Sequence, residues 1–117
     1  MNLTVTLETT FEVGHQAPYP ETCRRQHGHL VHLAATLVGG PVAERGSFPA
    51  AYGSLADGLY AIRDELSLRN LNDLIAPANP TAPGLAFWAW ERLVMSVPGL
   101  RAVEVRMGPE ITARVER

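Results

Sequence analysis

Hydrophobic and polar residues alternate along residues 3–15, with most Leu, Val and Phe side chains at odd positions and most Thr and Glu at even ones. A period of two is typical of a β-strand with one buried face. Residues 27–38 carry the hydrophobic run of a second strand, which ends at the turn signal Gly39-Gly40-Pro41. Residues 16–26 contain two prolines and are predicted to be a loop. We therefore predict two long strands that can pair antiparallel.

The pattern changes to helical spacing in the middle of the chain. Hydrophobic residues recur at intervals of three and four over residues 53–68 and again over residues 84–97, which predicts two amphipathic helices. Pro98-Gly99 ends the second helix, and residues 68–83 are predicted to be a loop between the two. Helix positions expected to pack on the sheet are Leu55, Leu59, Ile62, Trp88 and Leu93.

Alternation returns near the C-terminus. Residues 102–107 and 111–115 each predict a short strand, and Gly108-Pro109 forms a turn or a bulge between them. The expected order is strand, strand, helix, helix, strand, strand, in a single domain of residues 1–117. This is an α+β plan, in which a four-stranded antiparallel sheet carries two helices on one face. A sheet this small has exposed edges, so we expect oligomerisation through them.

Composition narrows the class of protein. The 117 residues are 46% hydrophobic and 19% charged, which suits a folded core, and the net charge of −2 offers no electrostatic attraction to nucleic acid or to an anionic membrane. A single cysteine excludes an internal disulfide and favours a reducing compartment. The N-terminus shows no signal-peptide pattern, and no apolar run reaches membrane-spanning length. We therefore expect a cytoplasmic protein.

The candidate chemistry lies in three histidines. His27 and His29 are two apart in a predicted strand, so their side chains point to the same face. His15 closes the preceding strand, and antiparallel pairing could bring it beside them. Three histidines with water as fourth ligand form a catalytic zinc pattern. From the residues alone, a zinc site and three ordinary imidazoles are equally good interpretations. His32 falls on the opposite face and is expected to be an edge or packed residue.

Four stretches together resemble the 6-pyruvoyl-tetrahydropterin synthase family, and in particular its bacterial 6-carboxytetrahydropterin synthase branch of the 7-deazaguanine (queuosine) pathway. The match spans almost the whole chain, and the cysteine–histidine motif is its most specific part. The stretches are Phe11-Glu12-Val13-Gly14-His15, Cys23-x-x-x-His27-Gly28-His29, Leu71-Asn72-Asp73 followed by Asn79-Pro80-Thr81, and the helix with Trp88 and Trp90.

The resemblance implies a fold, a reaction and an assembly. The fold would be the tunnelling fold (T-fold), in which trimers close a barrel and pair into a homohexamer. Zn²⁺ would be held by His15, His27 and His29, and would act as a Lewis acid on 7,8-dihydroneopterin triphosphate. Cys23 would move the proton as a thiolate. In the bacterial branch the product is 6-carboxytetrahydropterin, formed with loss of acetaldehyde and triphosphate.

Four further interpretations stay open. Cys23 could also be an inert small side chain or a fourth zinc ligand, although neighbouring arginines favour a reactive thiolate. Arg25, with Arg24, could contact a triphosphate or simply be solvated. Glu110 could bind the pterin ring or be an ordinary turn carboxylate, and Thr112 could assist it by hydrogen bonding.

The chain also departs from the family pattern. Ser67 and Leu68 stand where the family has an Asp and a His that complete its proton relay, and neither transfers protons as imidazole does. Met107 stands where the family has a pterin-binding glutamate, unless Gly108-Pro109 is an insertion and Glu110 replaces it. The departures favour slow turnover or a changed reaction, for which a retro-aldol cleavage is the first candidate. The alternative is a non-catalytic zinc- or pterin-binding homologue.

Overall fold

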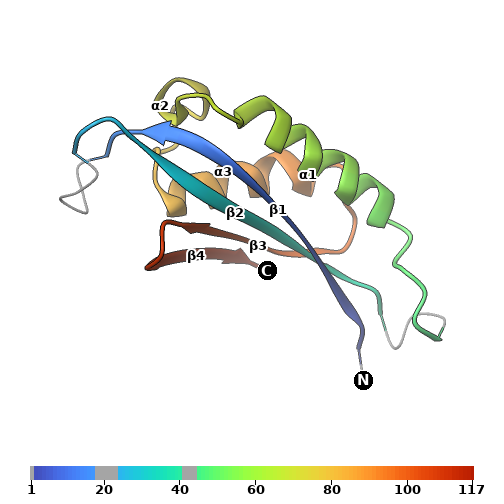
Figure 1. The fold of residues 1–117 in the computed structure, drawn as a ribbon. Coiled ribbons are helices and arrows are strands. Elements are labelled where there is room, and N and C mark those ends of the chain that lie inside the picture. Colours follow the sequence, from blue (N-terminus) through green and yellow to red (C-terminus); the bar gives the residue numbers. More distant parts are fainter. Residues whose placement is uncertain (1, 18–23, 41–44) are drawn as a thin grey trace.

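The computed structural model describes residues 2–17, 24–40 and 45–117. Its elements are β1 (Thr4–His15), β2 (His27–Val38), α1 (Tyr52–Leu66), α2 (Leu71–Leu74), α3 (Ala82–Val94), β3 (Leu100–Met107) and β4 (Ile111–Glu116) (Figure 1). The strands form one four-stranded sheet in the order β1-β2-β3-β4, and every neighbouring pair is antiparallel. The predicted α+β class, with a four-stranded antiparallel sheet, is confirmed.

The pairing of β1 with β2 runs the whole length of both strands. It extends from Thr4 opposite Val38 to His15 opposite His27. The pairing of β2 with β3 begins only at Val31, opposite Met107. The first residues of β2 therefore have β1 as their only strand neighbour in the described sheet. The two long strands project beyond the rest of the sheet, and His15, His27 and His29 lie on this projection.

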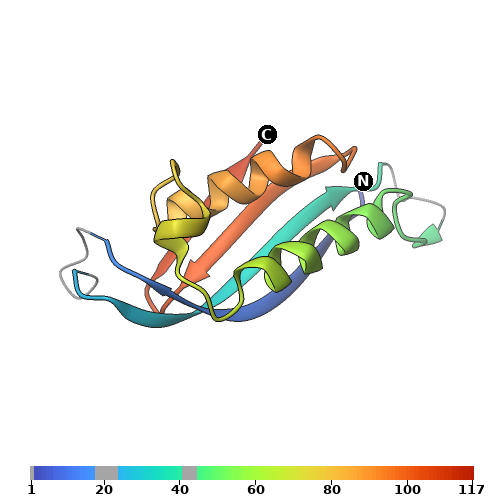
Figure 2. The same ribbon diagram turned by 90° about the horizontal axis from the view of Figure 1, so that it is seen from above.

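Both long helices cover the same face of the sheet (Figure 2). α1 packs over β1 and β2, and α3 packs over β3 and β4. The core lies between the helices and the alternate strand residues that face them. It includes Leu55, Leu59, Ile62, Leu66, Leu85, Leu93, Phe11, Val13, Val31, Leu33, Val103 and Val105. None of the described helices has the length and apolar character needed to cross a membrane.

The main difference from the predicted elements lies between the long helices. Residues 68–83 were predicted to be a loop throughout, but they contain α2 (Leu71–Leu74). Asn70 caps this helix, because its side chain accepts a hydrogen bond from the N–H of Asn72. α3 also begins earlier than predicted, at Ala82, because Thr81 caps it through the N–H of Gly84 and a proline is tolerated in its first turn.

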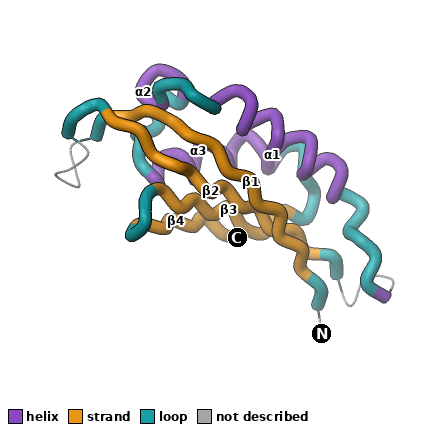
Figure 3. Tube along the Cα trace, viewed as in Figure 1, coloured by secondary structure: helices purple, strands orange, loops and turns teal. Residues whose placement is uncertain are grey.

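The short helix α2 lies against the projecting end of the long strands. Both tube and ribbon views show it near the end of β1 (Figure 3). Asn70 forms an isolated parallel bridge with Gly14, and the Gly14 N–H donates to the Arg69 carbonyl over 2.9 Å. The connection between the helices is therefore attached to the strand that carries His15.

Candidate metal centre

Three imidazoles meet where β1 ends and β2 begins. His15 is the last residue of β1 and lies opposite His27, while His29 follows two residues later on the same face. The Nε2 atom of His27 is 3.0 Å from that of His15 and 2.7 Å from that of His29. One nitrogen from each ring lies within 4.8 Å of the others, so the three histidines could hold a metal ion.

Backbone carbonyls set the orientation of two of these rings. His15 donates from Nδ1 to the Pro80 carbonyl over 2.6 Å, and His27 donates from Nδ1 to the Arg25 carbonyl over 2.5 Å. Because a carbonyl oxygen only accepts, Nδ1 carries the proton in both rings, and in the neutral form Nε2 keeps its lone pair. Two lone pairs that face each other over 3.0 Å repel, unless a proton or a cation lies between them. The donor set therefore fits a divalent metal that prefers imidazole nitrogen.

Burial favours the neutral ring that a metal needs. His15 is only 2% exposed, and burial lowers its pKa, with a smaller lowering from His27 and an opposing contribution from the Pro80 carbonyl. Burial also lowers the pKa of His29, as do the neighbouring His15 and His27. Desolvation and like charge both oppose protonation. Two of the three rings are thus kept available as ligands at neutral pH.

Several groups that support the rings were not among the predicted site residues. They are the carbonyl oxygens of Pro80 and Arg25, together with the side chains of Gln16 and Asn72. Backbone carbonyls leave no sequence signal, because every residue has one. The Asn-Pro-Thr stretch was expected only to shape a loop, and it also delivers the carbonyl that orients His15.

The structure describes only some of the other predicted site residues. Cys23 falls outside the described residues. Arg25 has an exposed side chain, while its carbonyl holds His27. Glu110 is exposed in the turn after β3, and Gly108 at the start of this turn lies against His29, since a Cβ there would be 3.6 Å from the ring.

Thr112 lies on the helix-free face of the sheet. It pairs with Arg106, while the neighbouring Ala113 packs toward the core on the other face. Side chains alternate along a strand, so Thr112 points away from the face that carries the imidazoles. Within one chain, the structure does not bring Thr112 to the three histidines.

The positions that depart from the family pattern carry no substitute relay group. Leu68 is 79% exposed, adopts a positive φ of 61°, and donates its N–H to the Glu12 carbonyl over 2.6 Å. Ser67 follows α1 and donates its N–H to the Arg63 carbonyl. Met107 is 5% exposed at the end of β3, opposite Val31. An apolar side chain, rather than a carboxylate, therefore occupies the interior at the end of this strand.

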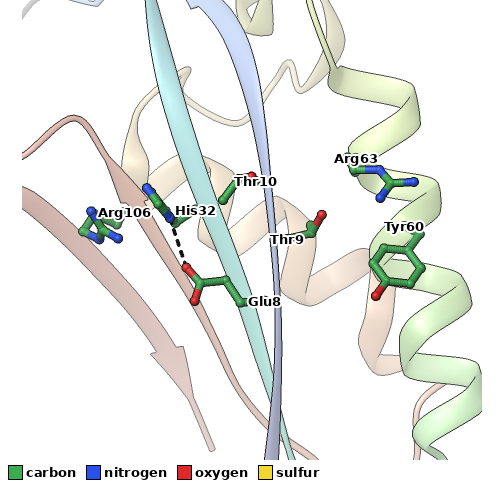
Figure 4. A pocket seen from close by; sticks show the side chains of 7 residues that line it. All are labelled: Glu8, Thr9, Thr10, His32, Tyr60, Arg63 and Arg106. Atoms are coloured by element: carbon green, nitrogen blue, oxygen red, sulfur yellow. Dashed lines mark hydrogen bonds and ion pairs between the residues drawn. The ribbon is translucent and has the colours of Figure 1, made fainter.

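A hollow lies around the middle of β1, away from the three converging histidines. Figure 4 shows Glu8, Thr10, His32 and Arg106 on one side of this strand, and Thr9, Tyr60 and Arg63 on the other. His32 contacts Glu8 over 3.1 Å (Figure 4), on the face of the sheet opposite His15, His27 and His29. The prediction that His32 lies on the other face is confirmed.

Comparisons with known proteins identify the family from the sequence and similar folds among solved structures. A sequence model of the family described as 6-pyruvoyl tetrahydropterin synthase matches residues 4–117. The fold is similar to that of Caenorhabditis elegans 6-pyruvoyl tetrahydropterin synthase, with a TM-score of 0.80 and 16% identity over 100% of this chain and 96% of that one. An uncharacterised Wolinella succinogenes protein has a TM-score of 0.80 and 17% sequence identity, over 100% of this chain and 99% of that one. The Plasmodium falciparum 6-pyruvoyl tetrahydropterin synthase has a TM-score of 0.70 and 11% sequence identity, over 99% of this chain and 98% of that one.

Proposed function

Because the chain belongs to the 6-pyruvoyl tetrahydropterin synthase family, we propose that it is a zinc-dependent lyase of pterin metabolism. The observation that carries this proposal is the convergence of three imidazole nitrogens within 4.8 Å. His15, His27 and His29 would hold the Zn²⁺. Bound there, the metal would supply Lewis-acid polarisation of a substrate oxygen.

The proposed substrate is 7,8-dihydroneopterin triphosphate, and the proposed product is 6-carboxytetrahydropterin. The resemblance of the Cys23-x-x-x-His27-Gly28-His29 spacing to the bacterial branch supports this choice. Removing a proton from a carbon next to a substrate oxygen requires a base. Cys23 would be this base at its Sγ atom, because nearby Arg24 and Arg25 favour the thiolate.

The remaining proposed contacts would bind the two ends of the substrate. Arg25 would contact the triphosphate, for which its forked donors are suited, and its exposed side chain is compatible with this role. Glu110 and Thr112 would bind the pterin ring. We propose a homohexamer, a dimer of trimers, in which the open edges of the sheet at β1 and β4 are paired. Within one chain Thr112 faces the helix-free side of the sheet, so its proposed contact with the pterin ring depends on this assembly.

Product analysis tests the proposed reaction. Zinc-loaded protein is incubated with 7,8-dihydroneopterin triphosphate and the pterins are identified by mass spectrometry, beside Cys23→Ala. We expect 6-carboxytetrahydropterin or another side-chain-cleaved pterin only when Cys23 is present. Unchanged substrate with stoichiometric zinc on the protein would mean that the proposed reaction is wrong.

The second candidate is a non-catalytic zinc- or pterin-binding homologue. The exposed Leu68, at the position where the resemblance implies a relay histidine, favours it. Cys23→Ala separates the two candidates. An enzyme loses turnover and retains zinc, whereas a binding protein retains both its zinc and its pterin affinity.

A further inference from the structure

The side chain of Asn72 holds the backbone immediately after a metal ligand. Its Oδ1 accepts from the Gln16 N–H over 2.9 Å, and its Nδ2 donates to the Gln16 carbonyl over 3.0 Å. Gln16 directly follows His15, the most buried of the three histidines. One carboxamide therefore makes both of the hydrogen bonds that a neighbouring strand would make with this residue.

The same residue connects to a second ligand. The side chain of Gln16 donates from Nε2 to the Arg24 carbonyl over 2.6 Å. The next carbonyl along the chain, that of Arg25, accepts the Nδ1 proton of His27. Fixing Gln16 thus restrains the backbone that flanks His15 and the backbone that orients His27.

Asn70 makes a similar hydrogen bond to the residue that precedes β2. Its Nδ2 donates to Oε1 of Gln26 over 3.1 Å, and Gln26 immediately precedes His27. Its Oδ1 accepts from the N–H of Asn72 over 2.9 Å, which ties the two asparagines together. The start of α2 therefore attaches to the residue after one ligand and to the residue before another.

From these contacts we propose that Asn72 is a positioning residue of the metal centre, which sets metal affinity by holding Gln16 and, through it, His15 and His27. The inference rests on the proposed metal-binding function. A site whose ligands are held in place before binding loses less conformational freedom when the metal enters, and partners outside the ligand shell commonly change affinity by about 10–100-fold.

Asn72 contributes little to the core. Its side chain is exposed, and the hydrophobic core is made by other residues. A role limited to general stability would lower the unfolding temperature of the metal-free and the metal-loaded protein equally. A positioning role lowers the metal affinity of the folded protein, and it reduces the rise in unfolding temperature that the metal produces.

The test compares Asn72→Ala with a control that loses a hydrogen bond at a distance from the histidines. Thr6→Val is suitable, since the Thr6 and Thr36 hydroxyls form a 2.7 Å hydrogen bond near the other end of the long strands. Zinc affinity is measured by competition with a chromophoric chelator on folded protein. Ligand geometry is followed by the visible absorption of bound Co²⁺. We expect Asn72→Ala to weaken zinc binding by about 10–100-fold and to alter the Co²⁺ spectrum, while Thr6→Val changes neither.

Asn72→Asp is a second test, in case Asn72→Ala does not fold. It keeps the size and the acceptor for the Gln16 N–H but removes the donor to the Gln16 carbonyl, so we expect an affinity between those of wild type and Asn72→Ala. Wild-type affinity in both variants overturns the inference and leaves the proposed function intact. A wild-type protein that binds neither Zn²⁺ nor Co²⁺ contradicts the proposed function itself.

Discussion

The Nδ1 proton of His15 is held by the carbonyl oxygen of Pro80 over 2.6 Å, although the two residues are 65 positions apart in the chain. Pro80 lies between α2 and α3, whereas His15 ends β1. The contact fixes the tautomer of the ring, because a carbonyl only accepts. The lone pair at Nε2 then faces the other two histidines. The connection between the helices thus determines the chemistry available at the end of the sheet.

The first prediction concerns ligand identity. His29→Ala removes one of three converging nitrogens and should weaken zinc binding by more than about 100-fold, which exceeds the effect of losing an outer partner. His32→Ala removes an imidazole from the same strand that faces the opposite side of the sheet and contacts Glu8. It should bind zinc as wild type does. Chelator competition measures both, and equal losses in the two variants would contradict the assigned ligand set.

The second prediction concerns the support of the Pro80 carbonyl. A Cβ at Gly84 would lie 1.8 Å from the Asn79 carbonyl oxygen, so Gly84→Ala must displace the backbone next to Pro80. We expect this substitution to destabilise the fold by at least about 1–3 kcal/mol, the usual cost of overpacking. It should also weaken zinc binding in the protein that remains folded, because the carbonyl that orients His15 moves.

Gly53→Ala is the matched control. Gly53 also lies in the first turn of a helix, α1, but a Cβ there meets no atom within 4 Å. Alanine should stabilise the protein by about 0.5–1 kcal/mol through helix propensity. Urea denaturation measures both changes. A Gly84→Ala protein as stable as Gly53→Ala would show that the loop yields without cost.

How far the sequence predicts this molecule depends on the range of the interactions involved. The period-two pattern placed His27 and His29 on one face, and full-length pairing of β1 with β2 brought His15 beside them. Alternation within each strand and antiparallel pairing of two strands that follow each other in the sequence suffice for these features. The supporting contacts are different, since Asn72 meets Gln16 across 56 positions, and no local pattern specifies such a pair. The catalytic role of Cys23 stays a prediction, because this residue lies outside the described part of the chain.

Leu68 is a case in which the sequence gives no warning of the backbone. Its φ of 61° lies in the left-handed region, which usually carries glycine. A loop was predicted from residue 68, but a leucine gives no indication of a left-handed conformation at that position. The structure ties the residue down through its N–H, which donates to the Glu12 carbonyl on β1.

The third prediction follows from this conformation. Leu68→Gly relieves a left-handed backbone that costs a non-glycine residue about 1–2 kcal/mol, and adds about 0.5–1 kcal/mol of unfolded-state entropy. Because the leucine side chain is 79% exposed, little burial is lost. We expect a net stabilisation of about 0.5–1 kcal/mol. Met95→Gly removes a similarly exposed side chain at a φ of −74° and should instead destabilise by about 1 kcal/mol. Changes of the same sign in urea denaturation would contradict the conformational argument.

The fourth prediction concerns pH in the metal-free protein. The pKa values of His15 and His29 are lowered from 6.5 in the fold, chiefly by burial. Between the folded pKa and 6.5 the unfolded chain binds more protons than the folded one, so stability rises with pH across this window. The stability that these two neutral rings contribute is fully present above pH 6.5 and is lost as the pH falls through their folded-state pKa values. Urea denaturation from about pH 5 to pH 7.5 measures the slope.

A variant without His15 and His29 isolates the contribution of these two rings to the slope. In His15→Gln/His29→Gln the titratable groups that do not contact these two rings keep their surroundings, so their contributions cancel in the difference from wild type. We expect the free energy of unfolding of wild type to rise more steeply with pH than that of the double variant, through the region just below 6.5. Equal slopes would mean that the folded protein protonates these rings as readily as the unfolded chain does. The folded protein would then not favour the neutral rings that metal binding requires.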